Sequence, residues 1–149
     1  MGYTSVTPTC IADTRAASAG PACATDNGMT LTPGGTLNVD IPSSLVPAGA
    51  GAAVVSIAVI QPNASGFASV FPFGSSFNSS NPTANINFVS GQTVDNHVTT
   101  ALGTASNGEG AFTIYDGPSS GGGNFNVEVN LEGYYEAASG AAYTLRPPT

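Results

Sequence analysis

Residues 125–131 have the sequence FNVEVNL, and this stretch decides the class of fold. Its apolar side chains are Phe125, Val127, Val129 and Leu131, and each is separated from the next by one asparagine or glutamate. A period of two is the period of a β-strand, whose successive side chains point to opposite faces. The stretch therefore predicts a strand with one face in a hydrophobic core and the other in water.

Similar segments recur along the rest of the chain, separated by turn residues such as Asn107-Gly108. The expected strands are 3–6, 11–14, 37–41, 53–60, 66–71, 85–89, 93–100, 112–115 and 125–131. The near-continuous apolar run at 53–60 predicts a central strand covered on both faces. We expect one antiparallel β-sandwich or jelly roll of about nine strands over residues 1–143, followed by a tail at 144–149.

The composition also favours strands. The chain has 149 residues, the size of one ordinary domain, and only 7% of them are charged, against about 25% in a typical soluble protein. Lysine is absent, and the two cations, Arg15 and Arg146, are outnumbered by nine carboxylates, for a net charge of −7. Helices take most of their solvent-facing residues from Glu, Lys, Gln and Arg, which are scarce here.

This charge balance excludes several classes of partner. A chain with two cations cannot neutralise many phosphates, so we expect neither a nucleic-acid partner nor an anionic membrane surface. The longest apolar run, 52–60, is shorter than the roughly 18 residues that span a bilayer. Residues 1–5 lack the basic start and apolar block of a secretory signal, so either a leader has been removed or the protein is made without one.

Cys10 and Cys23 are the two cysteines of the chain, and neither lies in a metal-ligand spacing. A disulfide between them would close a loop of about 15 residues and contribute about 3 kcal/mol in the chain-entropy model. The alternative is two buried thiols in a reducing cytoplasm. The disulfide is the interpretation that we favour.

Residues with catalytic potential are few. His97 is the single histidine, and it follows Asp95 in a strand pattern that places both on the polar face. A histidine beside a carboxylate can act as a general base, but this position favours a solvated polar residue. Ser65, Ser69 and the Ser79-Ser80 pair have no second histidine as a base, and a Gly-x-Ser-x-Gly motif is absent. We therefore expect no catalytic residue and no enzyme.

Two oxygen-rich segments, Asp26-Asn27-Gly28 and Asp116-Gly117, contain the ligand types that Ca²⁺ prefers. No EF-hand spacing surrounds them, and Asp and Asn favour turns because of their local hydrogen bonds. We expect plain turns at both places, with neither a metal nor a cofactor.

Asp13-Thr14-Arg15 places a carboxylate two residues before one of the two cations, so both side chains can lie on one side of an extended segment. A bidentate guanidinium–carboxylate contact would pin the N-terminal segment to the sheet. An arginine that contacts a ligand is the alternative. We favour the structural clamp and assign structural roles to Asp13, Arg15, Cys10 and Cys23.

Several motifs occur together in a consistent order. They are Tyr3-Thr4-Ser5-Val6-Thr7-Pro8, Ile11-Ala12-Asp13-Thr14-Arg15, Val46-Pro47-Ala48-Gly49-Ala50, the run from Val54 to Asn63, NINFVSGQTVDN at 85–96, and Val127 to Tyr135 with Gly133-Tyr134-Tyr135. In this order they resemble a module that recurs in secreted and cell-surface proteins of actinobacteria and related soil bacteria. The resemblance implies a β-rich accessory domain, often appended to other extracellular domains, with no assigned catalytic residue or cofactor. The chain is also similar to β modules of phage virion proteins, which decorate capsids or tails.

Two functions are compatible with these features. The first is a virion surface protein, such as a capsid decoration or tail-associated module, that packs with itself or with a major structural protein such as a capsid protein. The second is a secreted bacterial cell-surface module for adhesion, glycan binding or fibre formation. In the second, Tyr3, Tyr134, Tyr135 and Tyr143 would stack on sugars. We favour the virion surface and expect a homo-oligomer, because a surface of Asn, Ser, Thr and Gly packs against itself without desolvating ammonium groups.

Overall fold

The computed structural model describes residues 2–15, 28–78 and 83–137. Within these ranges the chain forms nine strands and no helix, which confirms the all-β prediction. The strands are β1 (Tyr3–Asp13), β2 (Thr36–Asp40), β3 (Ala52–Ile60), β4 (Gly66–Pro72), β5 (Ile86–Phe88), β6 (Val94–Ala101), β7 (Gly103–Thr104), β8 (Gly110–Gly117) and β9 (Asn126–Tyr135). The predicted tail and its boundary after residue 143 lie outside the described residues.

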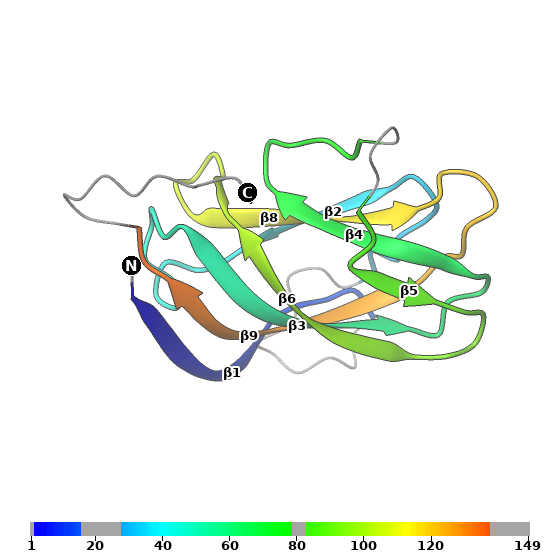
Figure 1. Cartoon of the computed structure of the whole chain (residues 1–149), viewed down its shortest axis with the longest axis horizontal. Helices are drawn as coiled ribbons and strands as arrows, with labels where there is room; N and C mark the ends of the chain where they lie inside the picture. The colour runs from blue at the N-terminus through cyan, green and yellow to red at the C-terminus, as the bar shows by residue number, and fades with distance from the viewer. Residues whose placement is uncertain (1, 16–27, 79–82, 138–149) are drawn as a thin grey trace, which may run out of the picture.

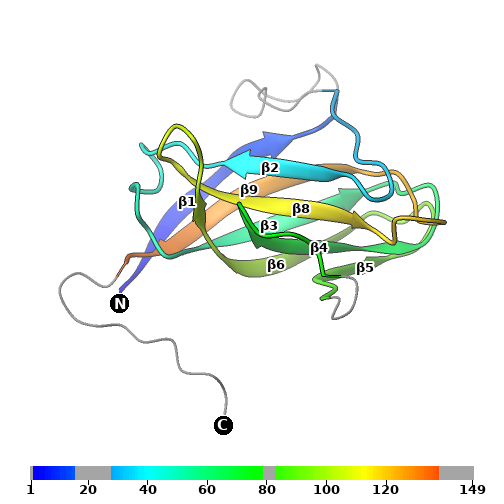
Figure 2. The same ribbon diagram turned by 90° about the horizontal axis from the view of Figure 1, so that it is seen from above.

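The strands form one long hairpin that is rolled into two sheets. β1 pairs with β9, β2 with β8, β3 with β6 and β4 with β5, all antiparallel, so the pairs are nested from the ends of the chain toward its middle. β9 also pairs with β3, and β8 with β4, which gives the sheets β1-β9-β3-β6 and β2-β8-β4-β5, with the short β7 beside β8. This nested order is a jelly roll. Figures 1 and 2 show the two sheets facing each other.

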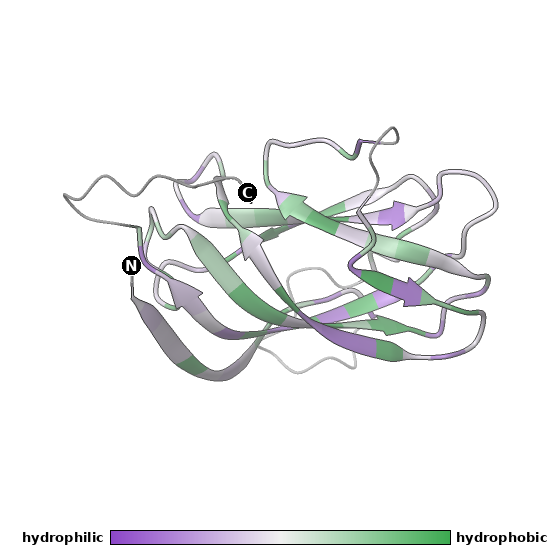
Figure 3. Cartoon of the chain, viewed as in Figure 1, coloured by the Kyte–Doolittle hydropathy of each residue, from purple (hydrophilic) through white to green (hydrophobic). Residues whose placement is uncertain are grey.

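The hydrophobic core fills the space between the sheets. Val127, Val129 and Leu131 of β9 are fully buried, as the alternation in the sequence predicts. Ile57 of β3 lies opposite Val129, so the inward-facing row continues onto the neighbouring strand. Phe112 of β8, also fully buried, belongs to the opposite sheet. Bands of hydrophobic and hydrophilic residues follow each other along the strands in Figure 3, as expected for strands that bury one face.

Two strands bury different faces from those that the sequence predicts. The expectation that residues 53–60 are covered on both faces is wrong, because only alternate residues of β3 are fully buried. The outward positions of β3 include the small residues Ala52, Ser56 and Ala58, which remain partly exposed. β8 is instead buried along its whole length. Its outer face lies under the segment that follows β4, as described below.

The two short strands expected at 3–6 and 11–14 form the single strand β1. Its register with β9 shifts between Ser5 and Thr9 and again between Cys10 and Ala12. Pro8 lies within the first irregular stretch, where the ladder needs no backbone N–H from it. Bulges of this kind redirect the side chains that follow them, and after the second shift Asp13 lies opposite Glu128.

Replacing Ile57 with Ala should lower the free energy of unfolding by about 2–5 kcal/mol, because it leaves a cavity at a fully buried position. Urea unfolding followed by circular dichroism measures the change. Thr99→Ala, at an exposed position of the neighbouring strand β6, is the control and should change stability by less than about 0.5 kcal/mol. Equal effects of the two substitutions would contradict this placement of the core.

Candidate functional site

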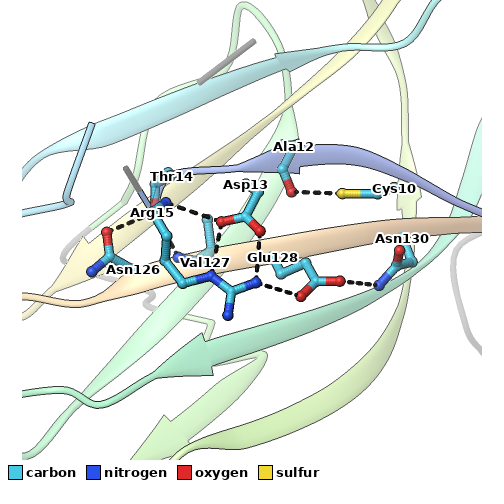
Figure 4. Close-up of polar contacts among 9 residues, drawn as sticks. All are labelled: Cys10, Ala12, Asp13, Thr14, Arg15, Asn126, Val127, Glu128 and Asn130. Atoms are coloured by element: carbon cyan, nitrogen blue, oxygen red, sulfur yellow. Dashed lines mark hydrogen bonds and ion pairs between the residues drawn. The ribbon is translucent and has the colours of Figure 1, made fainter. Parts of the chain in front are cut away.

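An ion-pair network lies on the outer face of the sheet β1-β9-β3-β6. The antiparallel register places Asp13 of β1 beside Glu128 of β9. The Arg15 side chain donates from Nε to Asp13 Oδ1 at 3.0 Å and from Nη2 to Asp13 Oδ2 at 2.6 Å. The same Nη2 also donates to Glu128 Oε1 at 2.8 Å. Figure 4 shows the guanidinium between the two carboxylates, so one cation holds together two acids on neighbouring strands.

The predicted contact between Asp13 and Arg15 is therefore present, and Glu128 is a third member that the sequence did not identify. The alternation along residues 125–131 places Glu128 on the outer face, but the register between the first and last strands is set by tertiary pairing. Glu128 Oε2 in turn accepts a hydrogen bond from Asn130 Nδ2 at 3.2 Å. The network thus runs from the end of β1 along the outer face of β9.

Thr14 fixes the backbone from which Arg15 extends. Its N–H donates to the carbonyl of Val127 at 3.0 Å, and its hydroxyl oxygen accepts from the Val127 N–H at 2.9 Å. The hydroxyl itself donates to Asn126 Oδ1 at 3.0 Å. Thr14 is completely buried, so these bonds are shielded from water. The position of Arg15 follows from this rigid attachment, and a structural role for the pair stays a prediction.

Burial and charge act in opposite directions on Asp13. Its side chain is 3% exposed, whereas that of Arg15 is 42% exposed. The hydrogen bonds and the charge of Arg15 outweigh desolvation and hold the pKa of Asp13 below its usual value. Asp13 in turn raises the pKa of Arg15, mainly through their hydrogen bond. Asp13 therefore stays ionised in the folded protein at neutral pH, and Arg15 supplies the positive charge that balances the buried carboxylate.

Cys10 of β1 is disulfide-bonded. Cys23, the other cysteine of the chain, lies outside the described residues. Cys10 Sγ lies 3.5 Å from the carbonyl oxygen of Ala12. A disulfide sulfur has no proton to donate, so this approach is a packing contact.

His97 lies on the solvent-facing side of β6, as predicted, and its side chain is 71% exposed. Its Nε2 is 2.9 Å from Glu132 Oε2 of β9. Of the serines considered as nucleophiles, Ser69 is buried in β4 of the other sheet, and Ser79 and Ser80 lie outside the described residues. Ser56 of β3, which the sequence prediction did not consider, lies opposite His97 in the strand pairing. His97 and Glu132 thus form a pair on the surface of the sheet, a setting in which ion pairs contribute little to stability.

Asp116 is the feature that departs most from the sequence prediction. The turn expected at Asp116-Gly117 is wrong, because both residues belong to β8 and are buried. Asp116 is opposite the fully buried Ala68 of β4, on the inward face of the sheet. Its backbone bonds with Gly34 and Gly35 at 2.7 and 3.0 Å. Neither carboxylate oxygen has a hydrogen-bond partner among the described residues, and burial raises the pKa of Asp116 to about 7.

This environment gives no support to a metal site at Asp116. The described residues contain no group of three or more His, Cys, Asp or Glu side chains that could hold a metal ion. Asp26 and Asn27, the other segment considered for Ca²⁺, lie outside the described ranges. Within those ranges there is also no helix of the length and apolarity that a membrane span requires.

The tyrosines expected to stack on sugars have different environments. Tyr3 is 48% exposed, and its ring centroid lies 5.1 Å from that of Tyr135. The Tyr3 hydroxyl donates to the Glu132 carbonyl at 3.3 Å. Tyr134 packs against the core, and Tyr143 lies outside the described residues. Among the described tyrosines, the exposed Tyr3 and the half-buried Tyr135 form an aromatic pair at this end of the sandwich.

A hollow of about 620 Å³ lies on the outer face of the other sheet. Its floor includes Thr36 and Asn38 of β2 and Thr113 and Tyr115 of β8, and one wall is the segment 73–77 that follows β4. No charged side chain is among the described residues that line it. The sequence prediction missed this hollow, because nothing in the local pattern shows that the segment after β4 folds back over β8.

Comparisons with protein-family models, with curated proteins and with solved structures found no match to this chain. The resemblance to the actinobacterial module and to phage virion modules therefore stays a prediction. The function is inferred from the jelly roll and from the chemistry of its two outer faces.

Replacing Arg15 with Ala should destabilise the fold by about 1–3 kcal/mol at neutral pH, because it leaves the buried Asp13 carboxylate without its charged donor. Because the folded-state pKa of Asp13 is lowered, this stabilisation is present above the unfolded value of about 3.9. It is lost as the pH falls through the lowered folded value. Denaturant unfolding at neutral and at acidic pH measures both effects. A loss of partner binding with unchanged stability would instead make Arg15 a recognition residue.

Asp116 should give the opposite pH dependence. Because its folded pKa is raised to about 7, the folded state binds the extra proton between about pH 4 and pH 7. The stability therefore falls as the pH rises through this window, by about 2–4 kcal/mol in total. Asp116→Asn should remove this slope, measured by denaturant unfolding across the window.

Asp95→Asn, at an exposed position of β6, is the matched control for Asp116→Asn and should keep the slope of the unsubstituted protein. A slope that survives in Asp116→Asn would show that the Asp116 carboxyl is not the group responsible.

Proposed function

We propose that this protein is a non-catalytic structural module of a virion surface, packed against copies of itself or against a major structural protein such as a capsid protein. The observation that supports this best is the jelly-roll order of the strands, β1-β9-β3-β6 over β2-β8-β4-β5. Jelly rolls are the building units of many viral capsids, and they also occur in lectins. Because one fold serves many functions, the choice between them must also be supported by the chemistry of the protein's surfaces.

The positions of the titratable groups favour a structural role over catalysis. His97 lies on an open strand face with 71% of its side chain exposed. Asp116, whose pKa is raised to about 7, is sealed in the core with 0% exposure. A general acid or base must reach the proton that it transfers. The carboxyl of Asp116 is thus out of reach of a substrate despite its raised pKa.

Both ends of the described domain lie at one end of the sandwich. The Glu136 N–H donates to the Gly2 carbonyl at 3.1 Å, where the start of β1 pairs with the end of β9. Figure 1 shows the N-terminus beside the end of β9. A neighbour joined at this end would leave both outer faces free, which is the arrangement that a displayed module requires.

The low charge of the chain favours self-association. Short neutral side chains lose little rotamer entropy when an interface fixes them. The net charge of −7 opposes close packing, but salt screens exposed charges beyond about 8 Å at physiological ionic strength. The exterior is therefore suited to a repetitive array in which like faces meet.

Light scattering on the purified protein should give a mass that is a multiple of the monomer mass. The multiple should rise, or be reached at lower protein concentration, when the ionic strength is raised, because screening weakens the repulsion between copies of net charge −7. Electron microscopy of native particles labelled with an antibody against the protein tests the virion location. A strict monomer at every ionic strength, with no label on any particle or filament, would refute the proposal.

A secreted bacterial cell-surface module is the second candidate, and the disulfide at Cys10 favours it. Disulfides persist in oxidising environments and are rare in the cytoplasm. Antibody label on the cell envelope or in the culture medium, with none on virus particles, would decide for this candidate. In that location the module would serve adhesion, glycan binding or fibre formation.

A further inference from the structure

The hollow on the sheet β2-β8-β4-β5 is formed by the segment that follows β4. The chain leaves β4 at Pro72 and turns back over β8, with the Phe73 N–H donating to the Ala111 carbonyl at 3.1 Å. Gly74 has φ +95°, a backbone conformation that suits glycine. Phe77 then stacks on Tyr115 of β8, with ring centroids 4.1 Å apart and an angle of 7° between the planes. Two anchors, a backbone bond and a ring stack, thus hold this segment above the sheet.

The lining combines aromatic rings with neutral hydrogen-bonding groups. Phe71, Phe73, Phe77 and Tyr115 supply the rings. Thr36, Asn38, Thr113, Ser75, Ser76 and Ser119 supply hydroxyl and amide groups. A purely apolar ligand would leave these polar groups without partners, which is costly. A ligand with both C–H faces and many hydroxyl groups would match both kinds of lining.

Charge excludes the other common ligands. No carboxylate or guanidinium is among the described residues that line the hollow, so neither a cation nor an anion would find a counter-charge there. The net charge of −7 further disfavours an anion. The volume of about 620 Å³ lies within the range of about 300–1,000 Å³ for small-molecule sites.

Asn38 is positioned to form a hydrogen bond with a ligand in the hollow. The Thr113 hydroxyl donates to Asn38 Oδ1 at 2.7 Å, which orients the amide. Thr113 is 4% exposed, whereas Asn38 is exposed. Among the described residues, the Asn38 amide nitrogen has no hydrogen-bond acceptor, so it is available as a donor for a ligand. Thr36 lies two residues earlier on the same face of β2 and adds a hydroxyl at the hollow.

We propose that the hollow between β2, β8 and the segment 73–77 binds a neutral oligosaccharide, with sugar C–H faces against the phenylalanine rings and sugar hydroxyls bonded to Asn38 and Thr36. Aromatic rings offer flat apolar surfaces of the kind that a sugar ring can cover. This function goes beyond the structural role proposed for a virion surface, and it assigns a site and a ligand class to the glycan binding named for the second candidate. It holds for either location of the protein, because a displayed module presents the same face on a particle or on a cell.

The test uses the purified protein and immobilised neutral oligosaccharides based on glucose, galactose and mannose, with sulfated and sialylated oligosaccharides for comparison. Binding to at least one neutral oligosaccharide is expected, with little change from low to high salt, because no charged group takes part. Asn38→Ala should weaken this binding about three- to tenfold through the loss of one neutral hydrogen bond. Asn87→Ala, at an exposed position of β5 in the same sheet, is the matched control and should bind normally.

Melting curves of both variants show whether the fold is intact, since Asn38 accepts a hydrogen bond from Thr113 that holds two strands together. If Asn38→Ala melts earlier, Thr36→Ala, which removes an exposed hydroxyl, provides the second test and should also weaken binding. The proposal is overturned if no neutral oligosaccharide binds or if charged oligosaccharides bind better. It is also overturned if binding depends on Tyr3 rather than on Asn38. These outcomes do not depend on the particle or cell location, so they are distinct from a failure of the structural proposal.

Discussion

The pairing of the first strand with the last is the constraint on which the other features depend. β1 and β9 are the two longest strands, with 11 and 10 residues. They pair from Tyr3 and Tyr135 at one end to Asp13 and Glu128 at the other. Every other long pair of strands is nested inside this one. This pairing gives β9 a partner on its outer side, so that its backbone groups are satisfied by β1 on one side and by β3 on the other.

Asp13 and Asp116 show how the same side chain takes opposite properties in this fold. Both are almost completely buried. Asp13 receives the forked donors of Arg15, so its charged form is favoured and its pKa is lowered. Asp116 receives no donor from the described residues, so its neutral form is favoured and its pKa is raised. The difference arises from the guanidinium of Arg15. As a result, the stabilisation from Asp13 is lost at acidic pH, whereas the stabilisation from Asp116 is lost as the pH rises toward about 7.

The two outer faces of the sandwich differ in chemistry. The face of β1-β9-β3-β6 holds the ion pairs of Arg15 and the pair between His97 and Glu132. The face of β2-β8-β4-β5 holds an uncharged hollow walled by aromatic rings. One face can therefore pack through polar and charged contacts while the other receives a neutral ligand. Self-packing and ligand binding need not compete for the same residues.

The sequence by itself determined the class of fold. The alternation at residues 125–131 places Val127, Val129 and Leu131 in the core, and the structure agrees. The period of two is a local property of the strand, so it can be seen without the partner strands. The contact between Asp13 and Arg15 was predictable for the same reason, because two residues along an extended chain point to the same side.

Tertiary structure decided what a local pattern does not contain. The apolar residues of 53–60 predict a strand covered on both faces, but β3 buries only one face. β8 is the strand covered on both faces, because the segment 73–77 folds over it. Glu128 joins Arg15 only through the register between the first and last strands. Asp116 resembles a turn residue in the sequence and lies in the core because β8 extends through it. In each case the outcome depends on contacts between segments that are far apart along the chain. These contacts are set by the way the nested pairs of strands fold into two facing sheets.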